Sequence, residues 1–99
     1  MGLRVSLHAR ARTDLRAIHD YLLLHANPHS AERVRAHLLQ RMEQLSDLPL
    51  IGQATNRAGV RVLKATRYPY RVYYSVRANE VVILHVRHTA RQTPDDVEE

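Results

Sequence analysis

The stretch that decides the fold is residues 60–91, VRVLKATRYPYRVYYSVRANEVVILHVRHTAR. Apolar and polar residues alternate along much of it, which predicts antiparallel strands at about 60–66, 70–77 and 81–88, joined by short turns. The strand at 81–88 is apolar at nearly every position. We therefore expect this strand to be central in the sheet and buried on both faces.

The same part of the chain has an uneven charge distribution. No carboxylate occurs between Asp47 and Glu80, and that interval contains six cations: Arg57, Arg61, Lys64, Arg67, Arg71 and Arg77. Fourteen of the 15 cations in the chain are arginine, whose planar guanidinium binds phosphates and carboxylates through paired hydrogen bonds. Residues 1–94 have a net charge of +9, because four of the ten carboxylates lie in an acidic tail at 95–99. This distribution predicts an anionic partner.

Length and composition restrict the class of protein. A chain of 99 residues forms one domain, which we place at 1–94. Cysteine is absent, so disulfides and thiolate metal sites are excluded, and the histidines are scattered, so we expect no metal and no cofactor. No apolar run approaches the roughly 20 residues that span a bilayer, and the start lacks the apolar segment of a secretory signal. We therefore expect a cytoplasmic protein.

The residues before this stretch predict a short strand at 3–7 and two helices. Apolar residues recur at helical spacing, in the first helix at Ala11, Leu15, Ile18 and Leu22, and in the second at Ala31, Val34, Leu38, Met42 and Leu45. Asp14 lies early in the first helix, where a negative charge suits the helix dipole. Asn27-Pro28 ends that helix, and Ser30 is the expected N-cap of the second. Residues 50–59 are expected to be a loop.

The resulting order, β-α-α-β-β-β, is that of an α+β domain in which an antiparallel sheet packs against an N-terminal helical hairpin. Within the strand at 70–77, alternation separates two faces. The residues expected in the core are Val72, Tyr74 and Val76. The residues expected to face outward, where they could contact a partner, are Arg71, Tyr73, Ser75 and Arg77.

Six motifs follow one another along the chain. They are Ser6-x-x-Ala9, Asp14-Leu15-x-x-Ile18-x-x-Tyr21, Leu45-x-x-Leu48-Pro49-x-x-Gly52, Gly59-x-Arg61-x-Leu63, Tyr70-Arg71-Val72-x-Tyr74-x-Val76 and Val82-Ile83-Leu84-x-Val86-x-His88-x-x-Arg91. In this order and with these spacings the chain resembles the RelE/ParE superfamily of toxins from type II toxin–antitoxin systems, over about residues 3–94. The ending His88-Thr89-Ala90-Arg91 is more similar to the ParE branch than to the RelE branch.

The resemblance implies two partners. ParE-like toxins act on DNA gyrase, and the residues expected to contact the target are Arg61, Arg71, Tyr73, Arg77, His88 and Arg91. The resemblance also implies a small acidic antitoxin that folds on binding and neutralises the toxin. The residues expected to contact this antitoxin, through carboxylates and an apolar helix face, are Arg12, Arg16, Leu23, Leu24, Arg35 and Leu39.

Two alternatives remain open at this point. The first is a RelE-like endonuclease that cuts mRNA in the ribosome, for which the candidate catalytic residues are Lys64, Arg71, Arg87, His88 and Arg91. The resemblance implies that RelE-like enzymes often have a tyrosine near the C-terminus and that related nucleases use a glutamate base from the sheet region. This chain departs from both patterns, because it has no tyrosine after Tyr74 and no carboxylate in the sheet region before Glu80. A strand-end His88 is also explained as a half-buried side chain bonded to the backbone. The second alternative is an antitoxin-binding protein without toxicity. The residues thus favour a protein that binds its target and is not an enzyme.

Overall fold

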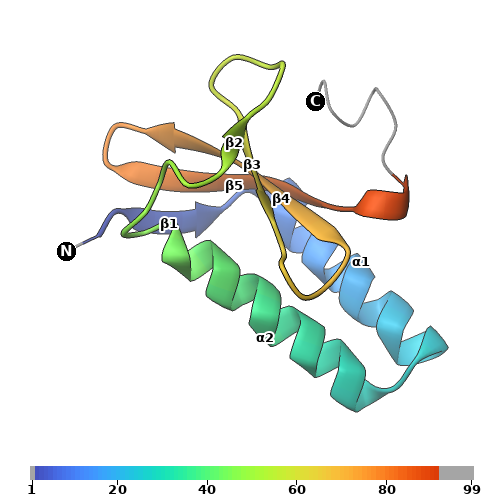
Figure 1. The fold of residues 1–99 in the computed structure, drawn as a ribbon. Helices are drawn as coiled ribbons and strands as arrows, with labels where there is room; N and C mark the ends of the chain where they lie inside the picture. Colours follow the sequence, from blue (N-terminus) through green and yellow to red (C-terminus); the bar gives the residue numbers. More distant parts are fainter. Residues whose placement is uncertain (1, 92–99) are drawn as a thin grey trace.

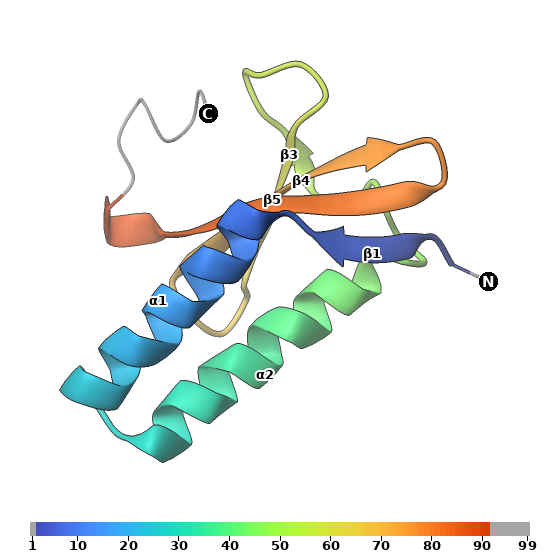
Figure 2. The ribbon, with the colours of Figure 1, turned by 180° about the vertical axis from the view of Figure 1, so that it is seen from behind.

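The computed structural model describes residues 2–91 and shows two helices on one face of a five-stranded sheet (Figures 1 and 2). The elements are β1 (Arg4–Leu7), α1 (Ala9–His25), α2 (Pro28–Gln44), β2 (Gln53–Ala54), β3 (Arg61–Lys64), β4 (Tyr70–Arg77), β5 (Glu80–His88) and the 3-10 helix η1 (Thr89–Arg91). The predicted α+β architecture with an N-terminal helical hairpin is confirmed. The acidic tail at 95–99 lies outside the described residues.

The sheet is mostly antiparallel, with the strand order β1-β5-β4-β3-β2. β3, β4 and β5 pair antiparallel in sequence order, as predicted. β1 instead pairs parallel with the first half of β5, with Arg4 opposite Glu80 and Leu7 opposite Ile83. The helical hairpin and strands β2 to β4 lie between these two strands in the chain, so the connection is long enough for a parallel pair. The two-residue strand β2 lies in the segment that was predicted to be loop only.

β5 is central between β1 and β4, but the prediction that both of its faces are buried is only partly correct, since on the outer face His85 is buried and its neighbours are not. Val81 and Ile83 are buried against the helices, whereas Val82 and Leu84 are only half-buried. The reason is that the helices cover one face of the sheet. β5 also contains a bulge, since Tyr73 pairs with His85 and Tyr74 with Ile83, leaving Leu84 without a partner in β4.

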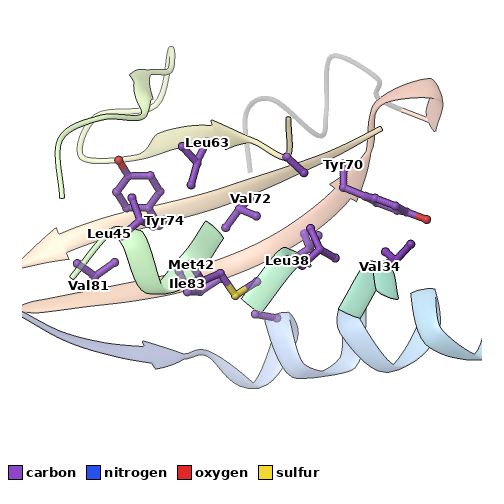
Figure 3. Packing of buried hydrophobic residues seen from close by; sticks show 13 residues of the cluster. Val34, Leu38, Met42, Leu45, Leu63, Tyr70, Val72, Tyr74, Val81 and Ile83 are labelled. Atoms are coloured by element: carbon purple, nitrogen blue, oxygen red, sulfur yellow. The ribbon is translucent and has the colours of Figure 1, made fainter. Parts of the chain in front are cut away.

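The core forms where the apolar stripes of the helices meet the inner face of the sheet (Figure 3). Ten of its residues are Val34, Leu38, Met42, Leu45, Leu63, Tyr70, Val72, Tyr74, Val81 and Ile83. The predicted core residues Val72 and Tyr74 are completely buried, and Val76 packs at the margin. Truncating a fully buried leucine such as Leu38 to alanine costs roughly 2–5 kcal/mol in sites of this kind.

Two predictions about the helix ends are corrected by side-chain contacts. Asn27, not Ser30, caps α2, because its Oδ1 accepts a hydrogen bond from Ser30 N at 2.8 Å and Pro28 occupies the first turn. Asp14 lies in the second turn of α1 and has a role other than complementing the dipole. Its Oδ2 accepts the Val86 N–H at 2.9 Å, which ties α1 to the half of β5 that β1 does not pair.

Candidate functional site

A buried tyrosine hydroxyl fixes the segment that leads into β3. Tyr74 Oη donates to the Pro49 carbonyl at 2.8 Å and accepts the Gly52 N–H at 2.9 Å. A Cβ on Gly52 would lie 2.6 Å from Tyr74 Oη and 2.8 Å from the Val62 carbonyl oxygen, so only glycine fits there. Burial raises the pKa of Tyr74, and the Gly52 N–H and nearby Arg61 partly oppose that rise. The hydroxyl is therefore a neutral structural group.

Arg61 was predicted to contact the target, but the structure places it in this same region. Its Nη1 donates to the Gly52 carbonyl at 2.7 Å and lies 3.5 Å from the Leu50 carbonyl. These bonds hold the loop before β3 against the strand. The motif residues Pro49, Gly52, Arg61 and Tyr74 thus form one structural lock. Arg61 therefore has a structural role, and its contact with the target stays a prediction.

Three cations stand side by side across the outer face of the sheet, away from the helices. The strand register places Lys64 opposite Arg71 and Arg71 opposite Arg87. Lys64 is exposed, and the two arginines are half-buried. Like charges directly opposite one another destabilise a sheet, so a site that gathers them is suited to an anion. We call Lys64, Arg71 and Arg87 the cation row.

Tyr73 was predicted to be a surface contact, and this prediction is wrong. The side chain points to the outer face as expected but is only 2% exposed. It lies between Val62 of β3 and His85 of β5, and its ring centroid is 5.1 Å from that of His85. Alternation assigned the correct face, but neighbouring side chains cover the ring.

His88 lies on the opposite face from the cation row, since it pairs with the core residue Tyr70. It is half-buried, its Nδ1 accepts the Ala90 N–H at 3.0 Å, and its ring meets the Tyr70 ring edge-on at 5.1 Å. This is the backbone-bonded histidine that the sequence allowed. Arg77 is exposed at the end of β4. The Arg91 side chain lies outside what the structure describes.

The helical hairpin presents a separate basic groove of about 390 Å³. Three residues predicted to bind an antitoxin, Arg12, Arg16 and Arg35, line this groove together with Leu15 and His19. One carboxylate, Glu32, also lines it and pairs with Arg35 at 3.3 Å in an exposed contact of small energetic value. The arrangement offers positive charge beside apolar surface.

The three leucines predicted to bind an antitoxin differ in exposure. Leu23 and Leu24, near the end of α1, are 41% and 82% exposed and free to contact a partner. Leu39 is half-buried and packs against the core, so it offers less surface. Sequence reasoning missed a further exposed apolar cluster formed by Leu48, Leu50 and Ile51, which three apolar residues in a short loop could have indicated.

Sequence reasoning also missed the contact between α2 and the β3–β4 turn. His37 of α2 is half-buried, its ring meets Tyr68 edge-on at 5.3 Å, and its buried Nε2 has no hydrogen-bond partner within residues 2–91. Burial lowers the pKa of His37, and the charges of Arg67 and Arg41 lower it further. Arg41 also donates twice to the Lys64 carbonyl, at 3.0 and 3.2 Å.

The described part of the chain contains no group of three residues able to hold a metal ion. None of its helices is long and apolar enough to cross a membrane.

Comparison with known proteins gives a family match and a set of similar folds. The family model described as "ParE toxin of type II toxin-antitoxin system, parDE" matches residues 5–93. No curated protein gave a significant match. Among solved structures, the chromosomal ParDE toxin–antitoxin system from P. aeruginosa is similar at a TM-score of 0.79 and 23% identity, covering 87% of this chain and 95% of that chain.

Two further solved structures show the same fold. The toxin–antitoxin complex RelBE2 from Mycobacterium tuberculosis is similar at a TM-score of 0.66 and 23% identity, covering 89% of this chain and 92% of that chain. The archaeal RelE–RelB complex from Pyrococcus horikoshii OT3 is similar at a TM-score of 0.54 and 20% identity, covering 93% of this chain and all of that chain. At these identities the likeness concerns the fold.

Proposed function

The chain belongs to the ParE family of toxins from type II toxin–antitoxin systems, and we propose that it inhibits growth by poisoning DNA gyrase. We further propose that it works in the cytoplasm, is not itself an enzyme and is neutralised by a cognate acidic antitoxin. The family match supports the class of protein, and the chemistry of the outer sheet face supports the choice of target.

The observation that carries this proposal is that, within residues 2–91, neither histidine of β5 is placed to serve the cation row as an exposed acid or base. Cleavage of RNA through its 2′-hydroxyl requires a base for that hydroxyl and an acid for the leaving oxygen. His88 lies on the other face of the sheet, and His85, on the same face as the row, is only 4% exposed. No carboxylate lies in the chain between Asp47 and Glu80. This arrangement supports a row that binds an anionic surface over one that cuts RNA.

The experiment is a gyrase assay with purified toxin. We expect the toxin to inhibit supercoiling or to increase gyrase-dependent breaks in plasmid DNA. Arg71→Gln should weaken this effect, because Arg71 lies at the centre of the row, whereas Arg33→Gln on the exposed surface of α2 should not. Unchanged gyrase activity at saturating toxin would refute the proposal.

The alternative is a RelE-like mRNA endonuclease, and one observation favours it. Three of the five candidate catalytic residues, Lys64, Arg71 and Arg87, stand together where they could bind a phosphate and stabilise its developing charge. Ribosomes programmed with a defined mRNA test this directly. Position-specific cleavage by the toxin, abolished by Arg71→Gln, would support the nuclease over the gyrase poison.

The basic groove of the helical hairpin is the proposed antitoxin surface. We expect an antitoxin segment in which acidic and apolar residues alternate from turn to turn. Its carboxylates would pair with the arginines of the groove, and its apolar side chains would contact the exposed leucines near the end of α1. These residues are Arg12, Arg16, Arg35, Leu23 and Leu24. Since such a segment is disordered before binding, part of the interaction energy is used to order it.

A further inference from the structure

A second hollow, of about 620 Å³, shares no residue with the groove on the helices. It lies where the start of α1, the β2–β3 loop and strands β4 and β5 come together. Three arginines from three different segments line it, Arg10, Arg57 and Arg77, together with the buried Ser75 and His85. Its volume falls within the range of ligand-binding sites.

The loop that presents Arg57 is held in a defined conformation. Ser75 Oγ donates to the Gly59 carbonyl at 2.7 Å, which fastens the loop to the outer face of β4. Thr55 donates to the Val60 carbonyl through both its N–H and its hydroxyl, at 3.1 and 2.8 Å. Val60 N in turn donates to the Arg57 carbonyl at 3.1 Å. The hollow is thus preorganised by hydrogen bonds.

The positive charge in the hollow is poorly compensated. Within residues 2–91, no carboxylate lines the hollow, and neither Arg57 nor Arg77 forms an ion pair. Glu80 is opposite Arg77 in the sheet register but does not come within ion-pair distance. Arg10 pairs through Nε with Asp14 at 3.4 Å, in a contact that leaves the arginine side chain 47% exposed. Such a site attracts an anion.

The outer face has positive charge at two places along one strand. Arg77 at the hollow and Arg71 in the cation row are six residues apart on β4 and on the same face, a separation of roughly 20 Å. A small anion would occupy only one of these sites. Duplex DNA carries one phosphate charge per about 1.7 Å of its axis, so it can meet both at once.

We propose that the hollow binds backbone phosphates of duplex DNA. The bound duplex runs along the outer face of β4, from the hollow to the cation row. The choice of duplex DNA rests on the proposed function, because gyrase holds its DNA as a duplex. On this basis the toxin contacts the DNA segment in the gyrase complex as well as the enzyme, and it reads no base sequence.

The test uses the whole purified toxin and a fluorescently labelled 20-base-pair duplex, with binding followed by anisotropy between 50 and 200 mM salt. The variant Arg57→Gln/Arg77→Gln removes two cations from the hollow. Because each phosphate contact contributes about 0.9 to the slope of log affinity against log salt, the slope should become shallower by about 1.8. Raising the salt from 50 to 200 mM weakens binding of both proteins, and the factor by which affinity falls should be about 12-fold smaller for the variant than for the wild type.

The matched control is Arg4→Gln/Arg33→Gln, which removes the same charge from exposed positions outside the hollow. Its slope should equal that of the wild type, and both variants should melt at the wild-type temperature because all four side chains are exposed. Equal slopes for the two variants would overturn the proposal. So would tighter binding to a single-stranded RNA of the same length, or displacement of the duplex by inorganic phosphate at constant ionic strength.

The gyrase assay separates this inference from the proposed function. A toxin that binds duplex DNA with the expected slope but leaves gyrase unaffected supports the DNA site and refutes the gyrase proposal. The opposite result is that the toxin poisons gyrase but its affinity for duplex DNA does not rise when the salt is lowered. That result would refute the DNA site and leave the gyrase proposal intact.

Discussion

Replacing Tyr74 by phenylalanine removes one buried oxygen and tests the structural lock before β3. The Gly52 N–H is then buried without its acceptor, and the Pro49 carbonyl loses its donor. An unsatisfied buried backbone group costs about 1–3 kcal/mol, and the loss of the second, partly buried bond costs about 0.5–1.5 kcal/mol. The ring itself is retained, so packing should change little. We therefore expect the free energy of unfolding to fall by roughly 2–4 kcal/mol.

Urea unfolding followed by circular dichroism measures this change. The midpoint should fall while the slope of the transition stays constant, because the surface exposed on unfolding is unchanged. A loss of about 2–4 kcal/mol corresponds to a melting temperature lower by roughly 8–30 °C in a domain of this size. Since burial raises the pKa of Tyr74, the wild type should also lose stability as the pH rises above 10.0, where the unfolded tyrosine ionises and the folded one does not.

The matched control is Tyr68→Phe, which removes a hydroxyl from a half-buried side chain that forms a ring contact with His37. This change should alter stability by no more than about 0.5 kcal/mol. If Tyr74→Phe is no more destabilising than this control, the hydroxyl does not fasten the loop and the reasoning fails.

Three further predictions concern contacts that the structure adds. Asp14→Ala should destabilise the fold by about 1–3 kcal/mol and speed hydrogen exchange at the Val86 amide, whose acceptor is lost; unchanged exchange would contradict this role. Stability should fall as the pH drops below 6.5, because unfolded His37 takes up a proton that the folded side chain resists; His37→Gln should flatten this dependence. Arg12→Ala/Arg16→Ala should weaken antitoxin binding and its salt dependence, measured by calorimetry, with no effect on unfolding.

The fold was predictable because its signals are local and periodic. The strand at 70–77 matches β4, and alternation assigned Val72 and Tyr74 to the core face. Helical spacing identified Leu38 and the other buried residues of α2. These patterns follow from the geometry of one element and need no knowledge of its neighbours. The parallel pairing of β1 with β5 could not be predicted from these local patterns, because it depends on the path of the chain after the helical hairpin.

The candidate site was predictable only in part. Arg12, Arg16 and Arg35 were expected to act together, and the structure places them in one groove. The helical period and a short link between antiparallel helices were sufficient for that prediction. Arg61, by contrast, could not be assigned to the lock from the sequence. Its hydrogen bonds are with a loop nine to eleven residues away, whose path no local pattern defines.

The sequence by itself determined the α+β order of elements, the two faces of β4, the family, and the excess of positive charge between Asp47 and Glu80. Only the tertiary structure decided what those charges can do. The strand register brought Lys64, Arg71 and Arg87 into one row, and the packing around Tyr73 removed it from the surface. The physical reason is that periodicity specifies which face a side chain occupies, whereas its neighbours and its exposure depend on segments distant in the chain.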